Sequence, residues 1–262
     1  MTKYVMGIDH GGTSSKAVLF DLSGRAIASA HRSTPLLTPK PGHTERDMDV
    51  LWRMNCEAIR SAIASADIDA GDIIGISFSG HGKGLYLWGK DDRPVRPGIV
   101  STDSRAHAQV DRWYADGTAR RAYGITCQSV LASQPVALLR WLKENEPEAI
   151  EKTRYVFGVK DYVRYRMTGV ARGERTDLSG SNLVNLKTAA YDRELLALFG
   201  LEGIDGKLPP LVSSSEVCGS VTEACAALTG LKPGTPVAAG LFDIDACAIG
   251  MNLVDDSRLC VI

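Results

Sequence analysis

The feature that most limits what this chain can fold into is a glycine-containing turn between two short apolar segments near its start. Residues 5–8 and 16–20 each have the composition of a β-strand, and Gly11 and Gly12 lie between them. Small residues at such a point favour a tight antiparallel hairpin. Another strand-like segment, residues 26–33, follows a second short turn, so the sequence predicts an antiparallel meander of three strands.

The first turn also has a chemical interpretation. Its small residues would let backbone N–H groups close on a phosphate, and they are Gly11, Gly12, Thr13 and Ser14. Asp9, at the end of the preceding segment, could hold a magnesium ion through water. A plain β-hairpin explains the same residues equally well, because glycine turns are common. The turn alone therefore leaves both interpretations open.

The rest of the chain alternates helical and strand patterns. Apolar residues recur at helical spacing from 48 to 66, with Asp47 as the expected N-cap. Further helices are predicted at residues 106–114, 134–146, 160–168, 193–199 and 221–228, and further strands at 73–79, 85–88, 155–159 and 236–242. This order predicts an α/β domain whose mixed central sheet is opened by the meander.

Charge and cysteine content exclude several classes of protein. Lys and Arg number 30 against 31 Asp and Glu, so no basic field exists to attract nucleic acid. The six cysteines form no Cys-x-x-Cys pair, which predicts reduced thiols rather than a metal site. No apolar run is long enough for a membrane helix, and we expect a cytoplasmic protein. Residues 259–262 read as an apolar strand, which predicts a chain cut from a longer protein.

Asp243 is the candidate catalytic base. It follows the predicted buried strand at residues 236–242 and would lie at the carboxyl edge of a sheet, where α/β proteins bind ligands. A helix N-cap explains this position equally well from the residues alone. Asp245 is expected to be a solvated or capping aspartate. Asp177 lies in a polar stretch that predicts no more than a turn.

Several segments together resemble the FGGY family of carbohydrate kinases, and they are residues 7–21, 42–47, 160–169 and 240–250. The resemblance covers the whole chain and favours the L-xylulose kinase group, on residues 82–85, 135–146 and 228–243. It implies an actin-like (ribonuclease H-like) fold. It also implies that residues 1–262 are the N-terminal domain, with a C-terminal ATP-binding domain absent from this chain.

The resemblance implies that ATP phosphorylates a ketopentose, with L-xylulose favoured and Asp243 as general base. ATP and Mg²⁺ would be the cofactors, Asp9 holding the metal while the residues of the first turn line the γ-phosphate. Glycerol and D-xylulose kinases carry an amide residue after the catalytic aspartate, whereas Ile244 stands here. This departure leaves the sugar open, so that D-xylulose, erythritol or another pentulose are alternatives.

For the sugar, the resemblance implies contacts to Gly82, Lys83 and Asp103 as well as Asp243. Glycines at 82 and 84 would leave room for a ligand, and the lysine would donate to its hydroxyls. The alternative for Asp103 is a helix cap with a surface ion pair to the nearby arginine at 105. His81 is expected to be a hydrogen-bonded structural residue.

Two other functions share parts of this pattern. An actin-like ATPase of the chaperone or filament type would carry the same first hairpin, and a sugar-binding module would need no base. Lys16 is expected to point to solvent and is not assigned to the site. The expected partner is a small sugar, with neither nucleic acid nor membrane, and a homodimer is left open. On its own, this domain is expected to be inactive because domain closure completes such sites.

Overall fold

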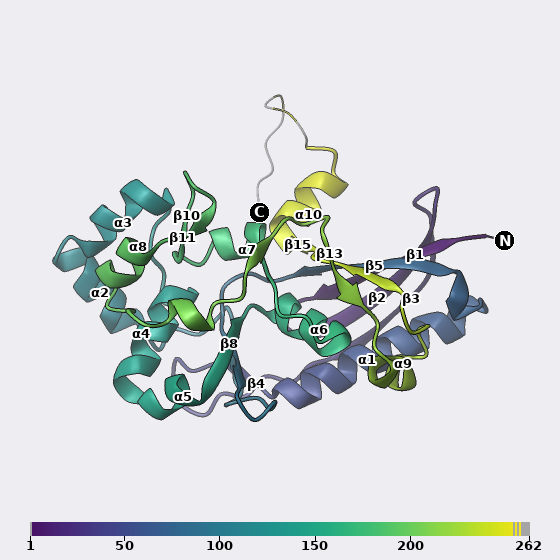
Figure 1. Cartoon of the computed structure of the whole chain (residues 1–262), viewed down its shortest axis with the longest axis horizontal. Coiled ribbons are helices and arrows are strands. Elements are labelled where there is room, and N and C mark those ends of the chain that lie inside the picture. Colours follow the sequence, from purple (N-terminus) through teal and green to yellow (C-terminus); the bar gives the residue numbers. More distant parts are fainter. Residues whose placement is uncertain (1, 254, 256, 258–262) are drawn as a thin grey trace.

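A mixed β-sheet of seven strands forms the centre of the computed structural model, which describes residues 2–253, 255 and 257 (Figure 1). The strands lie in the order β13-β14-β5-β1-β2-β3, and β15 pairs with β5 outside that path. The predicted antiparallel meander is confirmed, in strands β1 (Tyr4–His10), β2 (Ser14–Asp21) and β3 (Ala26–Ser33). The register of β1 against β2 places Asp9 opposite Lys16.

The other half of the sheet is built around β5 (Ile73–Gly80), which runs parallel to β1. From much later in the sequence, β14 (Pro236–Ala238) and β15 (Leu241–Phe242) also pair with β5 in parallel. The prediction of one continuous strand at residues 236–242 was therefore wrong. Gly240 interrupts it with a φ of +88°, and a Cβ there would clash with the Phe78 carbonyl oxygen, so the kink requires glycine.

Helices close one face of the sheet. The longest, α1 (Met48–Ala66), packs along β2 and β3, and the predicted N-cap is confirmed because Asp47 Oδ1 accepts the Val50 N–H. Figure 1 shows α1 along one side of the sheet and α10 (Asp243–Gly250) on the opposite side. Alternate strand residues, Met6, Ile8, Ala17 and Leu19, belong to the same buried core as the apolar side of α1. The residues between them therefore face the side away from α1.

Two more helices extend the layer on the α1 side, α6 (Val159–Thr168) and α9 (Glu223–Thr229). The last sheet strand, β13 (Val217–Ser220), pairs antiparallel with β14. The helix predicted at residues 160–168 is confirmed, and the one predicted at 221–228 begins two residues later, where Thr222 caps α9. Predicted strand and helix positions in this layer are thus correct within a few residues.

A second core lies beside the sheet and is mainly helical. The antiparallel pair β6 (Tyr86–Gly89) and β8 (Thr153–Phe157) joins it to the rest. Its helices are α2 (His107–Ala115), α3 (Thr118–Thr126), α4 (Pro135–Asn145), α5 (Pro147–Lys152) and α8 (Arg193–Leu198). Trp113 and Phe199 pack edge to face at its centre, with ring centroids 4.7 Å apart. The helices α3 and α5 were missed by the sequence pattern.

Short elements complete the part of the chain that the structure describes. They are β4 (Glu45–Arg46) paired with β7 (Gly98–Ile99), β9 (Gly173–Glu174) with β12 (Leu211–Val212), β10 (Val184–Asn185) with β11 (Ala190–Tyr191), helix α7 (Arg175–Ser179), and the 3₁₀ turns η1 (Ala70–Asp72) and η2 (Asp205–Lys207). None of the described helices has the length and apolar character needed to cross a membrane. The strand predicted at 259–262 lies outside the described residues.

Candidate active site

A cavity of about 920 Å³ opens on the face of the sheet away from α1. Its walls come from β1, β2, β5 and α10, and its polar side chains include Asp9, Lys16, Ser79 and Asp243. The predicted metal ligand and the predicted base therefore line the same space, although they are far apart in sequence. Lys16, which the sequence analysis did not assign to the site, also lines this cavity, and its side chain is exposed as expected.

Asp9 is held in place from the neighbouring strand. Its Oδ1 accepts a hydrogen bond from the Ser79 hydroxyl at 2.6 Å, across the β1–β5 pairing. Among the described residues, no group of three or more acidic, His or Cys side chains could cage a metal. Magnesium in phosphoryl-transfer sites is bound through one or two carboxylates, with water and phosphate oxygens completing its shell. Asp9 and Asp243 at one cavity fit that mode of binding.

Asp243 is the first residue of α10, and the residue at the N-cap position is Phe242. Asp243 Oδ1 accepts the N–H of Ile244 at 2.8 Å. Partial burial raises the pKa of the Asp243 carboxyl above its usual value; the Ile244 N–H opposes this rise, and the negative charge of Asp9 adds to it. A carboxylate with a raised pKa accepts a proton more readily, so the location and the chemistry both suit a general base.

Arg46 supports the glycine turn from beneath. This nearly fully buried side chain donates to the carbonyl oxygens of Gly11, at 3.5 Å, and Gly12. The Gly11 N–H is used inside the turn, donating to Ser14 O at 3.0 Å, whereas Gly12 and Thr13 are exposed. The N–H of Gly11 therefore does not fit the predicted phosphate contact. Sequence reasoning assigned no role to Arg46, because its partners in the turn lie more than thirty residues away.

Two buried histidines lie near Arg46. Burial, followed by the charge of Arg46, lowers the pKa of His10 to about 3 and that of His81 to about 4, so both are neutral. His81 Nδ1–H donates to Gly82 O at 3.2 Å, and the Tyr86 hydroxyl donates to His81 Nε2 at 3.4 Å. Both ring nitrogens of His81 thus have protein partners, in agreement with the structural role expected for it.

The glycines of the predicted sugar turn serve packing. A Cβ on Gly82 would clash with the ring of Phe242, and one on Gly84, which has a φ of +70°, would lie 2.5 Å from Ile99 O. The room that was predicted for a ligand is therefore filled by protein. Lys83 has a φ of +63° and is partly exposed, and neither it nor Gly82 lines the cavity.

Asp103 lies in a buried ion-pair network. Its side chain is 0% exposed, and Oδ2 accepts from Thr44 N–H at 2.7 Å and from Arg105 Nη2 at 2.8 Å. Oδ1 accepts two further hydrogen bonds from Arg105, whose guanidinium also pairs with Glu45. Both oxygens of the carboxylate are occupied by protein donors, so this geometry does not support the predicted sugar contact. The ion pair considered as its alternative exists, but it is buried instead of lying at the surface.

Comparison with known proteins agrees with this architecture. Residues 4–250 match the description "FGGY family of carbohydrate kinases, N-terminal domain". An L-xylulose/3-keto-L-gulonate kinase of Escherichia coli (strain K12) is 41% identical over 99% of this chain and 52% of its own length. A probable L-xylulose kinase of Pasteurella multocida is 39% identical over 98% of this chain and 53% of its own length. The chain thus spans about half the length of the curated relatives it matches.

A solved structure shows the same fold. The crystal structure of a gluconate kinase from Lactobacillus acidophilus superposes with a TM-score of 0.90 at 28% identity, covering 96% of this chain and 50% of the other. The expected actin-like α/β fold is therefore confirmed. The match to the family description spans nearly all of the described residues. The chain belongs to the FGGY family of carbohydrate kinases and matches the N-terminal domain of that family.

Proposed function

We propose that this domain carries the sugar site and the general base of an ATP-dependent kinase that phosphorylates a ketopentose, with L-xylulose as the favoured substrate. The observation that carries the proposal is the position of Asp243, which lines one cavity together with Asp9 and has a raised pKa. Family membership supports the reaction type. The names of the Escherichia coli and Pasteurella multocida relatives support the choice of sugar.

In this mechanism, the Asp243 carboxylate accepts the proton of the attacking sugar hydroxyl. The hydroxyl oxygen forms a bond to the γ-phosphorus of ATP while the bond to the leaving ADP oxygen breaks. Proton removal during the attack is the step that a general base accelerates. Because burial already disfavours the charged form of Asp243, its carboxylate is well suited to take up this proton.

The first turn and β2 would contact the phosphates. Gly12 and Thr13 are exposed at the tip of the turn, and Lys16 contributes a positive charge to the cavity wall. Mg²⁺, when bound through Asp9, supplies further neutralisation of the phosphate charge. The Ser79 hydroxyl holds Asp9 in one orientation, so the metal-binding carboxylate is ordered before the substrates arrive.

We also propose that a second domain supplies most of the nucleotide pocket. This chain spans about half the length of its relatives, and the cavity is bounded by the sheet and α10 alone. Closure of another domain over this face would exclude water from the reacting phosphate. Residues 1–262 alone are therefore expected to show negligible turnover.

The test is ADP release by the full-length protein, measured in a coupled assay with a panel of L-xylulose, D-xylulose, erythritol and glycerol. We expect release that depends on the sugar and is fastest with L-xylulose. A preference for another compound of the panel would change the proposed substrate and leave the proposed kinase reaction in place. ADP release at an equal rate without any sugar would contradict the kinase and favour an ATPase of the chaperone or filament type.

A further inference from the structure

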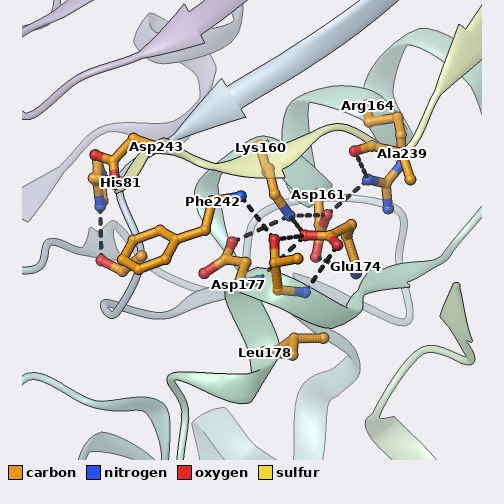
Figure 2. Close-up of polar contacts among 12 residues, drawn as sticks. His81, Lys160, Asp161, Arg164, Glu174, Asp177, Leu178, Ala239, Phe242 and Asp243 are labelled. Carbon is orange, nitrogen blue, oxygen red and sulfur yellow. Dashed lines mark hydrogen bonds and ion pairs between the residues drawn. The ribbon is translucent and has the colours of Figure 1, made fainter. Parts of the chain in front are cut away.

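Five charged side chains lie buried beside the segment that leads to Asp243 (Figure 2). This group, called the α6–α7 charge cluster below, consists of Lys160, Asp161, Arg164, Glu174 and Asp177, and none of them is more than 6% exposed. Burying a charge is unfavourable unless it is paired. None of the five lines the cavity, and the proposed reaction uses none of them directly.

Within the cluster the charges are paired closely. Lys160 Nζ lies 3.0 Å from Asp161 Oδ1 and 3.3 Å from both Glu174 Oε2 and Asp177 Oδ2. Arg164 Nη1 lies 2.7 Å from Asp161 Oδ1. These bonds join α6 to the start of α7, so the two helices form one rigid support.

The cluster also holds the backbone that precedes Asp243, at two points. Arg164 Nη1 donates to the carbonyl oxygen of Ala239 at 2.6 Å. The Phe242 N–H donates to the Thr176 hydroxyl at 2.9 Å, and that hydroxyl donates to Glu174 Oε2 at 2.7 Å. The two contacts lie on either side of the Gly240 kink, where the strand is interrupted and β15 is only two residues long. Side-chain bonds thus replace the support that a continuous strand would give.

The hydrogen-bond direction at Thr176 is fixed by its partner. A carboxylate only accepts, so the Thr176 hydroxyl must donate to Glu174 and keeps its lone pairs for the Phe242 N–H. Glu174 is itself held by the Ser214 hydroxyl at 2.9 Å and by Lys160.

We propose that Thr176, oriented by Glu174 and the α6–α7 charge cluster, is a positioning residue that fixes Phe242 and thereby the carboxylate of Asp243 at the cavity. This inference rests on the proposed function, in which Asp243 is the base. A base must be within hydrogen-bond reach of the proton that it removes, and a displacement of about 1 Å can lower a rate about a hundredfold. Thr176 itself touches neither the sugar nor the phosphate.

The experiment uses the full-length kinase. Thr176→Val removes the hydroxyl and keeps the shape, and we expect kcat to fall about ten- to a hundredfold while KM for the sugar changes less than about threefold. Thr176→Ser restores the hydroxyl and should restore kcat to within about threefold of the original. The matched control is Thr222→Val at the N-cap of α9, which removes another partly buried hydroxyl that accepts a backbone N–H, from Cys225 at 3.2 Å. The control should leave kcat unchanged.

A double-variant cycle with Asp243→Asn tests whether the threonine acts through the base. We expect Thr176→Val to cause no further loss of the residual rate in the Asp243→Asn background. The positioning role alone would be overturned if the losses of kcat in Thr176→Val and Asp243→Asn multiplied in the double variant. It would also be overturned if Thr176→Val and Thr176→Ser lost kcat equally, or if Thr176→Val kept its full kcat. Undiminished activity of Asp243→Asn would overturn the proposed base together with this inference.

A second variant covers the case in which Thr176→Val does not fold. Ser214→Ala removes a hydrogen bond to Glu174 Oε1 and leaves the charges of the cluster intact. We expect kcat to fall about two- to fivefold without a matching change in KM, because Glu174 then holds Thr176 less firmly. An unchanged kcat in this variant would contradict the role of Glu174 in orienting the threonine.

Discussion

Asp243 and Asp103 were assigned to the same sugar site from the sequence, and the structure gives them opposite environments. The Asp103 carboxylate is completely enclosed and receives all of its hydrogen bonds from Arg105 and the Thr44 backbone. Asp243 is partly buried beside another carboxylate, Asp9, and forms no ion pair with a Lys or Arg of the part of the chain that the structure describes. A compensated charge stabilises the fold, whereas an uncompensated charge at a cavity remains available for chemistry.

The largest expected effect concerns the uncompensated aspartate. Asp243→Asn in the full-length protein should lower kcat about 10²- to 10⁴-fold, the range that general-base catalysis contributes. Its melting temperature should not fall. The pKa of Asp243 is raised in the folded state, so the folded protein loses stability as pH rises through that pKa, and the neutral amide avoids this loss. Steady-state kinetics and thermal unfolding at pH 7 check both parts, and a destabilised variant would contradict the comparison.

The compensated aspartate, Asp103, should show the opposite result, which is a loss of stability with little change in activity. Asp103→Asn leaves Arg105 buried without its main partner, and we expect the free energy of unfolding to fall by about 3 kcal/mol. The kcat of the protein that remains folded should stay within about threefold of the original, because Asp103 does not reach the cavity. Chemical denaturation gives the first value. Loss of sugar affinity without loss of stability would restore Asp103 as a sugar ligand.

The smallest effect concerns the acid limb of the pH profile. Asp245 adds a negative charge near Asp243 and so contributes to its raised pKa. In Asp245→Asn that contribution is lost, so the pKa of Asp243 should fall and the decline of kcat/KM on acidification should move to lower pH. Rate profiles of both proteins between pH 4 and 8 on the same sugar measure the shift. A shift of this decline to higher pH would show that it reports the titration of a group other than Asp243.

Local patterns in the sequence predicted much of this fold. The meander and α1 were correct because each depends on neighbouring residues and a clear apolar period. The same reasoning could have placed Lys16 in the site, since a hairpin centred on residues 11–13 pairs it with Asp9 on one face. The break at Gly240 was not visible, because it depends on how closely the chain passes over Phe78.

The parts of the site that the sequence missed depend on distant partners. Asp103 and Arg105 read as a surface pair because their burial is completed by Thr44 and Glu45, almost sixty residues earlier. Asp177 read as a turn residue, although it lies against Lys160 in the α6–α7 charge cluster. Residue type and spacing indicate which groups could act, whereas only packing shows which charges are already neutralised.

The pairing of β15 with β5 has a consequence for how the protein is made. The two strands are about 160 residues apart, whereas β1, β2 and β3 pair with their immediate neighbours in sequence. During synthesis the meander can form early, but the strand that presents Asp243 can dock only after the whole helical region has left the ribosome. The nascent protein can therefore form the turn at Gly11 and Gly12 long before Asp243 reaches the cavity.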